Sequence, residues 1–124
     1  SVPVTPVILL IEDHTELGEV IQDVLTEEGY DVVAVRDQFA AVATLRSQRV
    51  DLVVADLPAP EPGQVDPLAE IVRDFADTPM VTIVEESPDS VPFFGPWRRS
   101  GDKVTLRRPF KLNDLLAVTR ELAG

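Results

Sequence analysis

The chain has 124 residues, 44% of them hydrophobic, and a formal net charge of −11, which fits one globular domain with its own core. No apolar run approaches the roughly 20 residues of a membrane span and no secretory signal opens the chain, so we expect a cytoplasmic protein without a membrane anchor. The lack of cysteine excludes disulfides and thiolate metal sites, and the acidic charge argues against a nucleic-acid surface on this domain.

The first half of the chain alternates apolar runs with helical patterns. Residues 1–6 contain two prolines and are expected to form a tail or a remnant of cloning. Continuous apolar runs predict strands at 7–11, 32–35 and 52–55. Apolar residues at helical spacing predict one helix from His14 to Gly29 and another that starts at Asp37 as its N-cap and runs through Leu45.

The second half continues the alternation after a rigid loop, because three prolines fall within residues 58–62. Asp66 as N-cap and Pro67 as the first helical residue predict a helix that extends to Phe75. Strands are expected at 80–84 and 104–106, and a last helix carries Leu115 to Leu122.

The segment from Glu85 to Asp102 interrupts this pattern. The alternation calls for a helix here, yet prolines recur every four residues, and a proline inside a helix costs about 3 kcal/mol. We therefore predict that the fourth helix is shortened, displaced or missing, and that Phe93 and Phe94 fill its space. Trp97 follows the last of these prolines and could anchor a partner or pack on the last strand.

Basic residues gather near the carboxyl end of the chain. Six of the eleven lie between residues 98 and 111, and only Asp102 opposes them. They are Arg98, Arg99, Lys103, Arg107, Arg108 and Lys111. Two interpretations stay open: a solvated surface that offsets an acidic body, or a docking face for an acidic partner.

Five strands alternating with helices predict an α/β sandwich of three layers with a parallel sheet. In such folds ligands bind at the carboxyl ends of the strands, where the strand order reverses. If the order is 2-1-3-4-5, the first and third strands are neighbours, and the carboxylates of Glu12, Asp13 and Asp56 converge at their ends.

Three converging carboxylates repel one another, so either one takes a proton or a cation lies between them. Mg²⁺ suits such an acidic cluster, because it prefers oxygen ligands and keeps several waters. Asp56, at the end of a buried strand, is the best placed to attack phosphorus and form an aspartyl phosphate. Acidic loop ends without a common site remain the alternative, and His14 is expected to be a surface side chain.

Three motifs follow one another along the chain: Glu12-Asp13, Asp56-Leu57 with Pro60, and Arg108-Pro109-Phe110. In this order and spacing they resemble the receiver domains of two-component response regulators, and the resemblance covers about Val7 to Leu122. The resemblance implies one receiver domain over residues 7–124, a flavodoxin-like sheet of order 2-1-3-4-5, and a signalling module rather than an enzyme.

The resemblance also implies roles for individual residues. Asp56 would accept a phosphoryl group from a sensor histidine kinase or a phosphotransfer protein. Mg²⁺ would be held by Asp13, Asp56 and the backbone carbonyl of Pro58, with Glu12 acting through metal-bound water. The bond between Arg108 and Pro109 is expected to be cis. The face formed by residues 85–111 would contact a second copy of the chain or a downstream protein.

Departures from the family pattern concern the readout of phosphorylation. Val84 stands where receivers have a Thr or Ser hydroxyl, Arg108 replaces the usual Lys, and Thr105 replaces the usual aromatic residue. We therefore expect an atypical receiver that keeps its addition site. One alternative is a pseudo-receiver, a binding module regulated without phosphorylation. Another is a phosphatase of the haloacid dehalogenase type, which Pro58 disfavours because that class has a second Asp at this position.

Overall fold

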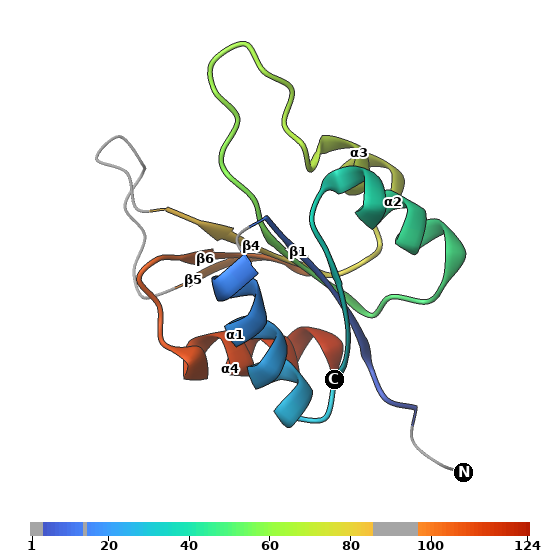
Figure 1. Ribbon diagram of the computed structural model, residues 1–124, viewed down its shortest axis with the longest axis vertical. Helices are drawn as coiled ribbons and strands as arrows, with labels where there is room; N and C mark the ends of the chain where they lie inside the picture. Colours follow the sequence, from blue (N-terminus) through green and yellow to red (C-terminus); the bar gives the residue numbers. More distant parts are fainter. Residues whose placement is uncertain (1–3, 14, 86–96) are drawn as a thin grey trace.

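A computed structural model of the chain describes residues 4–13, 15–85 and 97–124. These residues form one six-stranded sheet of order β2-β1-β3-β4-β6-β5 (Figure 1). The strands are β1 (Val7–Glu12), β2 (Asp31–Val35), β3 (Leu52–Asp56), β4 (Met80–Val84), β5 (Trp97–Ser100) and β6 (Lys103–Arg107). The helices are α1 (Thr15–Glu27), α2 (Gln38–Ser47), α3 (Ala69–Asp74) and α4 (Leu112–Ala123).

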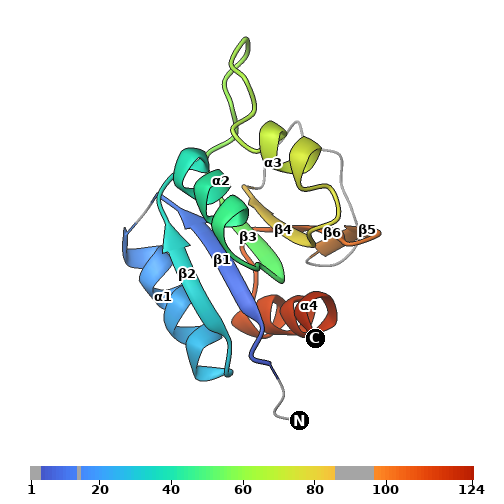
Figure 2. The same ribbon diagram turned by 90° about the vertical axis from the view of Figure 1, so that its right-hand side faces the viewer.

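Helices cover both faces of the sheet, with α1 and α4 on one face and α2 and α3 on the other (Figure 2). Both central strands, β1 and β3, are buried along their whole length. Their side chains alternate between two cores, as the period of two along a strand requires. Ile8, Leu10, Leu52 and Val54 pack toward α1 and α4, whereas Leu9, Ile11, Val53 and Ala55 pack toward α2 and α3.

This arrangement confirms the predicted flavodoxin-like sandwich. Strands β2, β1, β3, β4 and β6 are parallel neighbours in the predicted order, with β6 as the predicted fifth strand. Within the described part of the chain, none of the helices has the length and apolar character that crossing a membrane requires.

A local signal places the start of α2. The Asp37 side chain accepts a hydrogen bond of 2.8 Å from the backbone N–H of Ala40, so Asp37 is the N-cap of α2 as predicted. The side chain of Asp66 accepts from the N–H of Leu68 at 2.9 Å, but the prediction of Asp66 as a helix N-cap is wrong: the N-cap of α3 is Leu68, whose side chain makes no cap hydrogen bond. The helix that follows is shorter than predicted, because α3 begins only at Ala69 and Phe75 already has non-helical φ and ψ angles.

An antiparallel edge strand was not predicted. Residues 97–100 form β5, which pairs with β6 through a turn that contains Gly101 at φ +61°. Part of the segment expected to hold a fourth helix is therefore a strand. Residues 86–96, with Phe93 and Phe94, lie outside the described residues, and so does His14. Trp97 lies opposite Leu106 and packs against the core, as one of its two interpretations predicted.

Two of the basic side chains near β5 and β6 contact their own domain. Arg99 pairs with Glu121 of α4 at 2.5 Å, and Lys103 donates to the carbonyls of Ala76 and Thr78. These contacts favour a structural role for this part of the basic stretch over a docking role.

Candidate functional site

The predicted site residues gather at the carboxyl edge of the parallel sheet. Glu12 and Asp56 are register partners at the ends of β1 and β3, and both are buried, at 7% and 5% exposure. Asp13 follows directly after β1 and is exposed. Val84 ends β4, and Arg108 follows β6, so four strand ends contribute to one site.

A pocket of about 490 Å³ lies over Asp56. Its walls include the three predicted metal ligands together with Val84 and Arg108, so all of these positions meet in one place. The lining residues are Asp13, Leu17, Asp56, Leu57, Pro58, Ala59, Ile83, Val84, Glu85 and Arg108. Leu17 and Glu85 were not predicted as site residues; the position of Glu85 directly after a predicted strand was the signal that could have identified it.

Arg108 lies between two carboxylates. Its Nη2 donates to Oδ2 of Asp56, and its Nη1 donates to Oε1 of Glu85 at 2.9 Å. Burial lowers the pKa of the Arg108 guanidinium, but the hydrogen bond and charge of Asp56, and then those of Glu85, outweigh burial and raise the pKa above its usual value. Arg108 is therefore a permanent cation that balances the Asp56 carboxylate.

The peptide bond between Arg108 and Pro109 is cis, as predicted. The backbone N–H of Arg108 donates to the carbonyl of Val84 at 2.9 Å. This hydrogen bond fixes the start of the Arg108 side chain beside the end of β4.

Glu12 lies beside α1. Gly18 of α1 is so close that a Cβ atom added to it would lie 2.6 Å from Cγ of Glu12. Such a distance is far shorter than a normal carbon contact, so the absence of a side chain at position 18 makes room for Glu12. Glu12 lines a separate, smaller pocket of about 210 Å³ with Asp13 and Gly18, not the pocket over Asp56.

The oxygen atoms around Asp56 suit a hard divalent cation. Two carboxylates, from Asp13 and Asp56, and the peptide carbonyl of Pro58 belong to residues of the same pocket wall. Mg²⁺ is commonly held by one or two carboxylates and keeps waters on its other positions, so this donor set fits Mg²⁺. Within residues 4–13, 15–85 and 97–124, no three acidic, His or Cys side chains converge closely enough to form a protein-only metal cluster, so the predicted convergence of Glu12, Asp13 and Asp56 is not seen; Glu12 lines the smaller pocket beside α1 instead.

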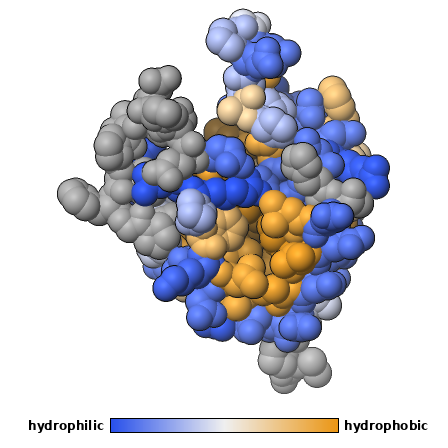
Figure 3. Space-filling view, turned by 60° about the vertical axis from the view of Figure 1, so that its left-hand side comes forward, coloured by the Kyte–Doolittle hydropathy of each residue, from blue (hydrophilic) through white to orange (hydrophobic). Residues whose placement is uncertain are grey.

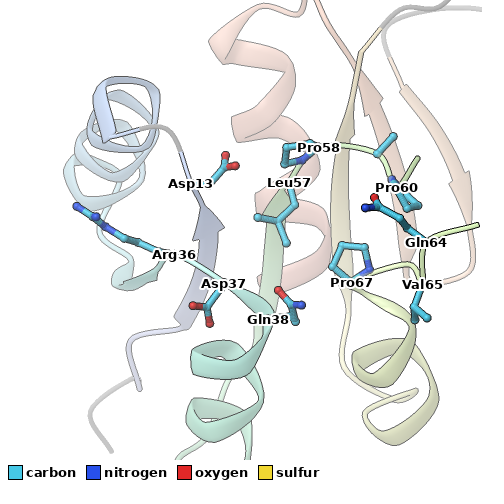
Figure 4. A pocket seen from close by; sticks show the side chains of 11 residues that line it. Asp13, Arg36, Asp37, Gln38, Leu57, Pro58, Pro60, Gln64, Val65 and Pro67 are labelled. Atoms are coloured by element: carbon cyan, nitrogen blue, oxygen red, sulfur yellow. The ribbon is translucent and has the colours of Figure 1, made fainter. Parts of the chain in front are cut away.

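A second, more open pocket of about 540 Å³ adjoins the first. Figure 4 shows its walls, which come from the segments that follow β1, β2 and β3 and include Asp13, Arg36, Asp37, Gln38 and the proline-rich loop. Asp13, Leu57, Pro58 and Ala59 line both pockets. The proline-rich segment after β3 forms an irregular loop beside Asp56, as predicted.

Apolar side chains lie on the surface near this edge. Val20 of α1 and Leu112 of α4 are 48% and 42% exposed, and Leu17 of α1 lines the Asp56 pocket. Figure 3 shows hydrophobic side chains gathered in the middle of one face, with hydrophilic ones around them. Apolar surface of this kind, rimmed by hydrophilic side chains, is typical of protein-binding faces.

Known proteins share both the sequence pattern and the fold. The DNA-binding response regulator MtrA of Mycobacterium tuberculosis (strain H37Rv) is 29% identical over 113 residues, which are 91% of this chain and 48% of MtrA. The chain spans about half the length of the curated relatives it matches. A response regulator receiver protein from Sinorhizobium medicae superposes with a TM-score of 0.71 at 23% identity, over 96% of this chain and 94% of that one.

The response regulator protein TrrA from Thermotoga maritima, solved in complex with Mg²⁺-BeF, gives a TM-score of 0.69 at 21% identity, over 95% of this chain and 99% of that one. In a second structure TrrA is in complex with the histidine kinase ThkA, and the matching chain gives a TM-score of 0.69 at 20% identity, covering 97% of this chain and 100% of that one. These likenesses establish the same fold.

The response regulator receiver domain family matches residues 8–120, which is nearly the whole chain. Receiver domains are signalling modules of two-component systems. From this match, the shared fold and the acidic edge, it follows that the chain belongs to the response regulator receiver domain family.

Proposed function

We propose that this domain is an atypical receiver in which Asp56 accepts a phosphoryl group with the help of Mg²⁺. The observation that carries this proposal is the position of Asp56. It is a buried carboxylate that opens into a pocket of about 490 Å³, with a paired cation on one side and further oxygen donors on the other. A carboxylate in such a place is an accessible nucleophile whose charge is already balanced.

The transfer itself is a displacement at phosphorus. A carboxylate oxygen of Asp56 forms a bond to the phosphorus atom, and the bond from phosphorus to the donor nitrogen or oxygen breaks. With acetyl phosphate as donor, the bonding electrons leave with acetate, so no proton is needed. Mg²⁺, when held by Asp13, Asp56 and the carbonyl of Pro58, would neutralise charge on the transferring group. Arg108 would turn from Asp56 to the new phosphoryl oxygens.

The site lacks the usual means of sensing the phosphoryl group. Val84 lines the pocket but has no hydroxyl to donate, and Thr105 of β6 replaces the aromatic side chain. We infer that phosphorylation acts on this domain mainly through the charged side chains around Asp56.

A phosphodonor protein needs a surface beside the pocket. The apolar side chains of α1 and α4, with Leu17 reaching the pocket wall, supply such a surface on this domain. We propose that a histidine kinase or a phosphotransfer protein docks there, and that a second copy of the chain or a downstream protein binds the 85–111 face.

Phosphoryl incorporation tests the proposal directly. Wild type, Asp56→Asn and Asp77→Asn are incubated with acetyl phosphate and Mg²⁺, and the added mass of one phosphoryl group is measured. Asp77 is an exposed acid at the amino end of β4, the opposite edge from the site, so its variant controls for the loss of one charge. Wild type and Asp77→Asn should be labelled and Asp56→Asn should not; equal labelling of wild type and Asp56→Asn would refute the proposal.

The second candidate is a pseudo-receiver, a binding module of the same family that is regulated without phosphorylation. Val84 favours it, and so does the ion pair that occupies Asp56. A wild-type protein that binds Mg²⁺ but takes no label, from acetyl phosphate or from phosphorylated kinases, would support this candidate instead.

A further inference from the structure

Two carboxylates share the guanidinium of Arg108. Nη2 donates to Asp56 at the floor of the pocket, and Nη1 donates to Glu85 at 2.9 Å on its rim. Both acids line the same pocket as Arg108. Because the backbone N–H of Arg108 also donates to the carbonyl of Val84, the residue before Glu85, this arginine is held beside Glu85 by its backbone as well.

The two carboxylates differ in their exposure to water. The Asp56 side chain is 6% exposed, whereas that of Glu85 is 77% exposed. Water screens the attraction between Glu85 and Arg108, so Glu85 biases the position of the guanidinium but does not fix it.

An anion bound at Asp56 would compete with Glu85 for the hydrogen-bond donors of Arg108. A phosphoryl group carries up to about two negative charges and offers three acceptor oxygens. It needs the N–H groups of Arg108, which has only one planar fork to offer. Glu85 holds one arm of that fork and adds a negative charge at the pocket rim, so it opposes the new anion.

We propose that Glu85 is a positioning residue that competes for Arg108 and thereby weakens the hold of the domain on an anion at Asp56. This inference rests on the proposed function, in which Asp56 carries that anion. Glu85 then affects how readily an anion binds at Asp56 and how long it stays bound. This effect matters in a pocket that has Val84 at the position where a hydroxyl would otherwise hold the phosphoryl group.

Binding of beryllofluoride in the presence of Mg²⁺ measures this hold. Removing the charge in Glu85→Gln should tighten binding about three- to fivefold, the size expected for an exposed ion pair. Glu85→Asp keeps the charge and should stay within about twofold of wild type. Asp77→Asn, which removes another exposed charge at the opposite edge, should bind as wild type does. Unchanged or weaker binding by Glu85→Gln would overturn the inference.

A double variant shows whether Glu85 acts through Arg108. Arg108→Met keeps most of the stem but has no donors, so in that background the effect of Glu85→Gln on binding should shrink to the part that comes from direct repulsion between Glu85 and the anion. The titration is followed by NMR with millimolar protein, so weakened binding is still measured. An effect of the same size with and without Arg108 would mean that Glu85 does not act by competing for it, and the inference would fail.

A measurement on the ligand-free protein separates this inference from the proposed function. The NMR signal of the Arg108 Nε–H group should shift in Glu85→Gln and not in Asp77→Asn, whether or not the domain accepts a phosphoryl group. If wild type binds no beryllofluoride while this shift occurs, the proposed function fails and the contact between Glu85 and Arg108 stands. If the signal does not move, the competition proposed for Glu85 is wrong.

Discussion

Arg108 donates from Nη2 to Oδ2 of Asp56, and this contact joins the ends of β6 and β3 across the intervening strand β4. The cation therefore occupies the carboxylate to which Mg²⁺ is expected to bind. We predict that Arg108→Gln raises the affinity for Mg²⁺ about three- to tenfold, because a nearby positive charge is removed from the metal site. Isothermal titration calorimetry with Mg²⁺, carried out on the variant and on wild type, measures the change in affinity.

The matched control is Arg120→Gln. Arg120 also pairs with an acid, Glu28 at 3.0 Å, but it lies at the far end of α4 from the site. Both variants lower the charge of the domain by one unit. Tighter Mg²⁺ binding by both to the same extent would trace the effect to net charge and not to the pair of Arg108 with Asp56.

Val84 offers a second test of the site. Val84→Thr places a hydroxyl in the pocket over Asp56 with nearly the same side-chain shape. Because the hydroxyl can donate to an anion there, beryllofluoride should bind about tenfold more tightly than to wild type, the equivalent of one good hydrogen bond. Val84→Ala opens the pocket but adds no donor, so it should bring no such gain. An equal gain in Val84→Ala would show that the loss of the valine, and not the new hydroxyl, tightens binding.

Gly18 and Glu12 predict an unusual stability effect. Alanine is favoured over glycine within a helix by about 0.5–1 kcal/mol, yet we expect Gly18→Ala to lower the free energy of unfolding by about 1 kcal/mol or more. The reason is the 2.6 Å approach of the new Cβ to Cγ of Glu12. Urea unfolding measures the change.

The same substitution should have the opposite sign once Glu12 is shortened. A Glu12→Gly background removes both Cγ and Cβ of residue 12, which would lie 2.6 and 3.3 Å from the new Cβ, so Gly18→Ala should there raise the free energy of unfolding by the helical preference, about 0.5–1 kcal/mol. If Gly18→Ala lowers the free energy of unfolding equally in both backgrounds, contact with Glu12 is not the reason that a side chain is disfavoured at position 18.

Tyr30 is the single tyrosine of the chain, and it packs partly against the core near α1 and α4. Burial raises the pKa of its phenol above the usual value; the charge of Arg120 lowers that pKa and the charge of Glu28 raises it. Absorbance at 295 nm should therefore show ionisation above about pH 10, the value of an unperturbed tyrosine. Arg120→Gln removes a charge that lowers this pKa, so the midpoint should move further up.

The raised pKa also fixes the sign of a stability change. The neutral phenol is favoured in the folded state, so its contribution is complete below the unfolded pKa of about 10 and is lost as pH rises through the folded pKa. Tyr30→Phe should remove this part of the alkaline loss of stability. A loss above pH 10 that is identical in wild type and Tyr30→Phe would contradict the assignment.

Several features of the fold could be predicted from local sequence alone. The apolar runs at 7–11 and 52–55 are long enough to name buried strands, and both become central strands of the sheet. Asp37 caps α2 with its own side chain, an interaction between residues three positions apart. The prolines after Asp56 ruled out regular structure there because they fix φ and remove donors, and residues 57–66 form no helix or strand.

Other features escaped prediction because they depend on distant partners. Residues 97–100 have no apolar pattern, and they form a strand only because the edge of β6 offers backbone groups to pair with. The helix α3 is shorter than its apolar spacing implied, since Phe75 turns out of the helix while it packs against the core around Ile71.

The sequence by itself determined which residues stand at the ends of the strands, and the motifs named Asp56, Asp13 and Arg108 as candidate site residues. Only the tertiary structure decided what they do to one another. Arg108 and Asp56 are 52 residues apart, and Arg108 and Glu85 are 23 apart, so no local pattern records their contacts. The order of the sheet brings three strand ends together, and the reach of one arginine side chain then couples a buried carboxylate to an exposed one.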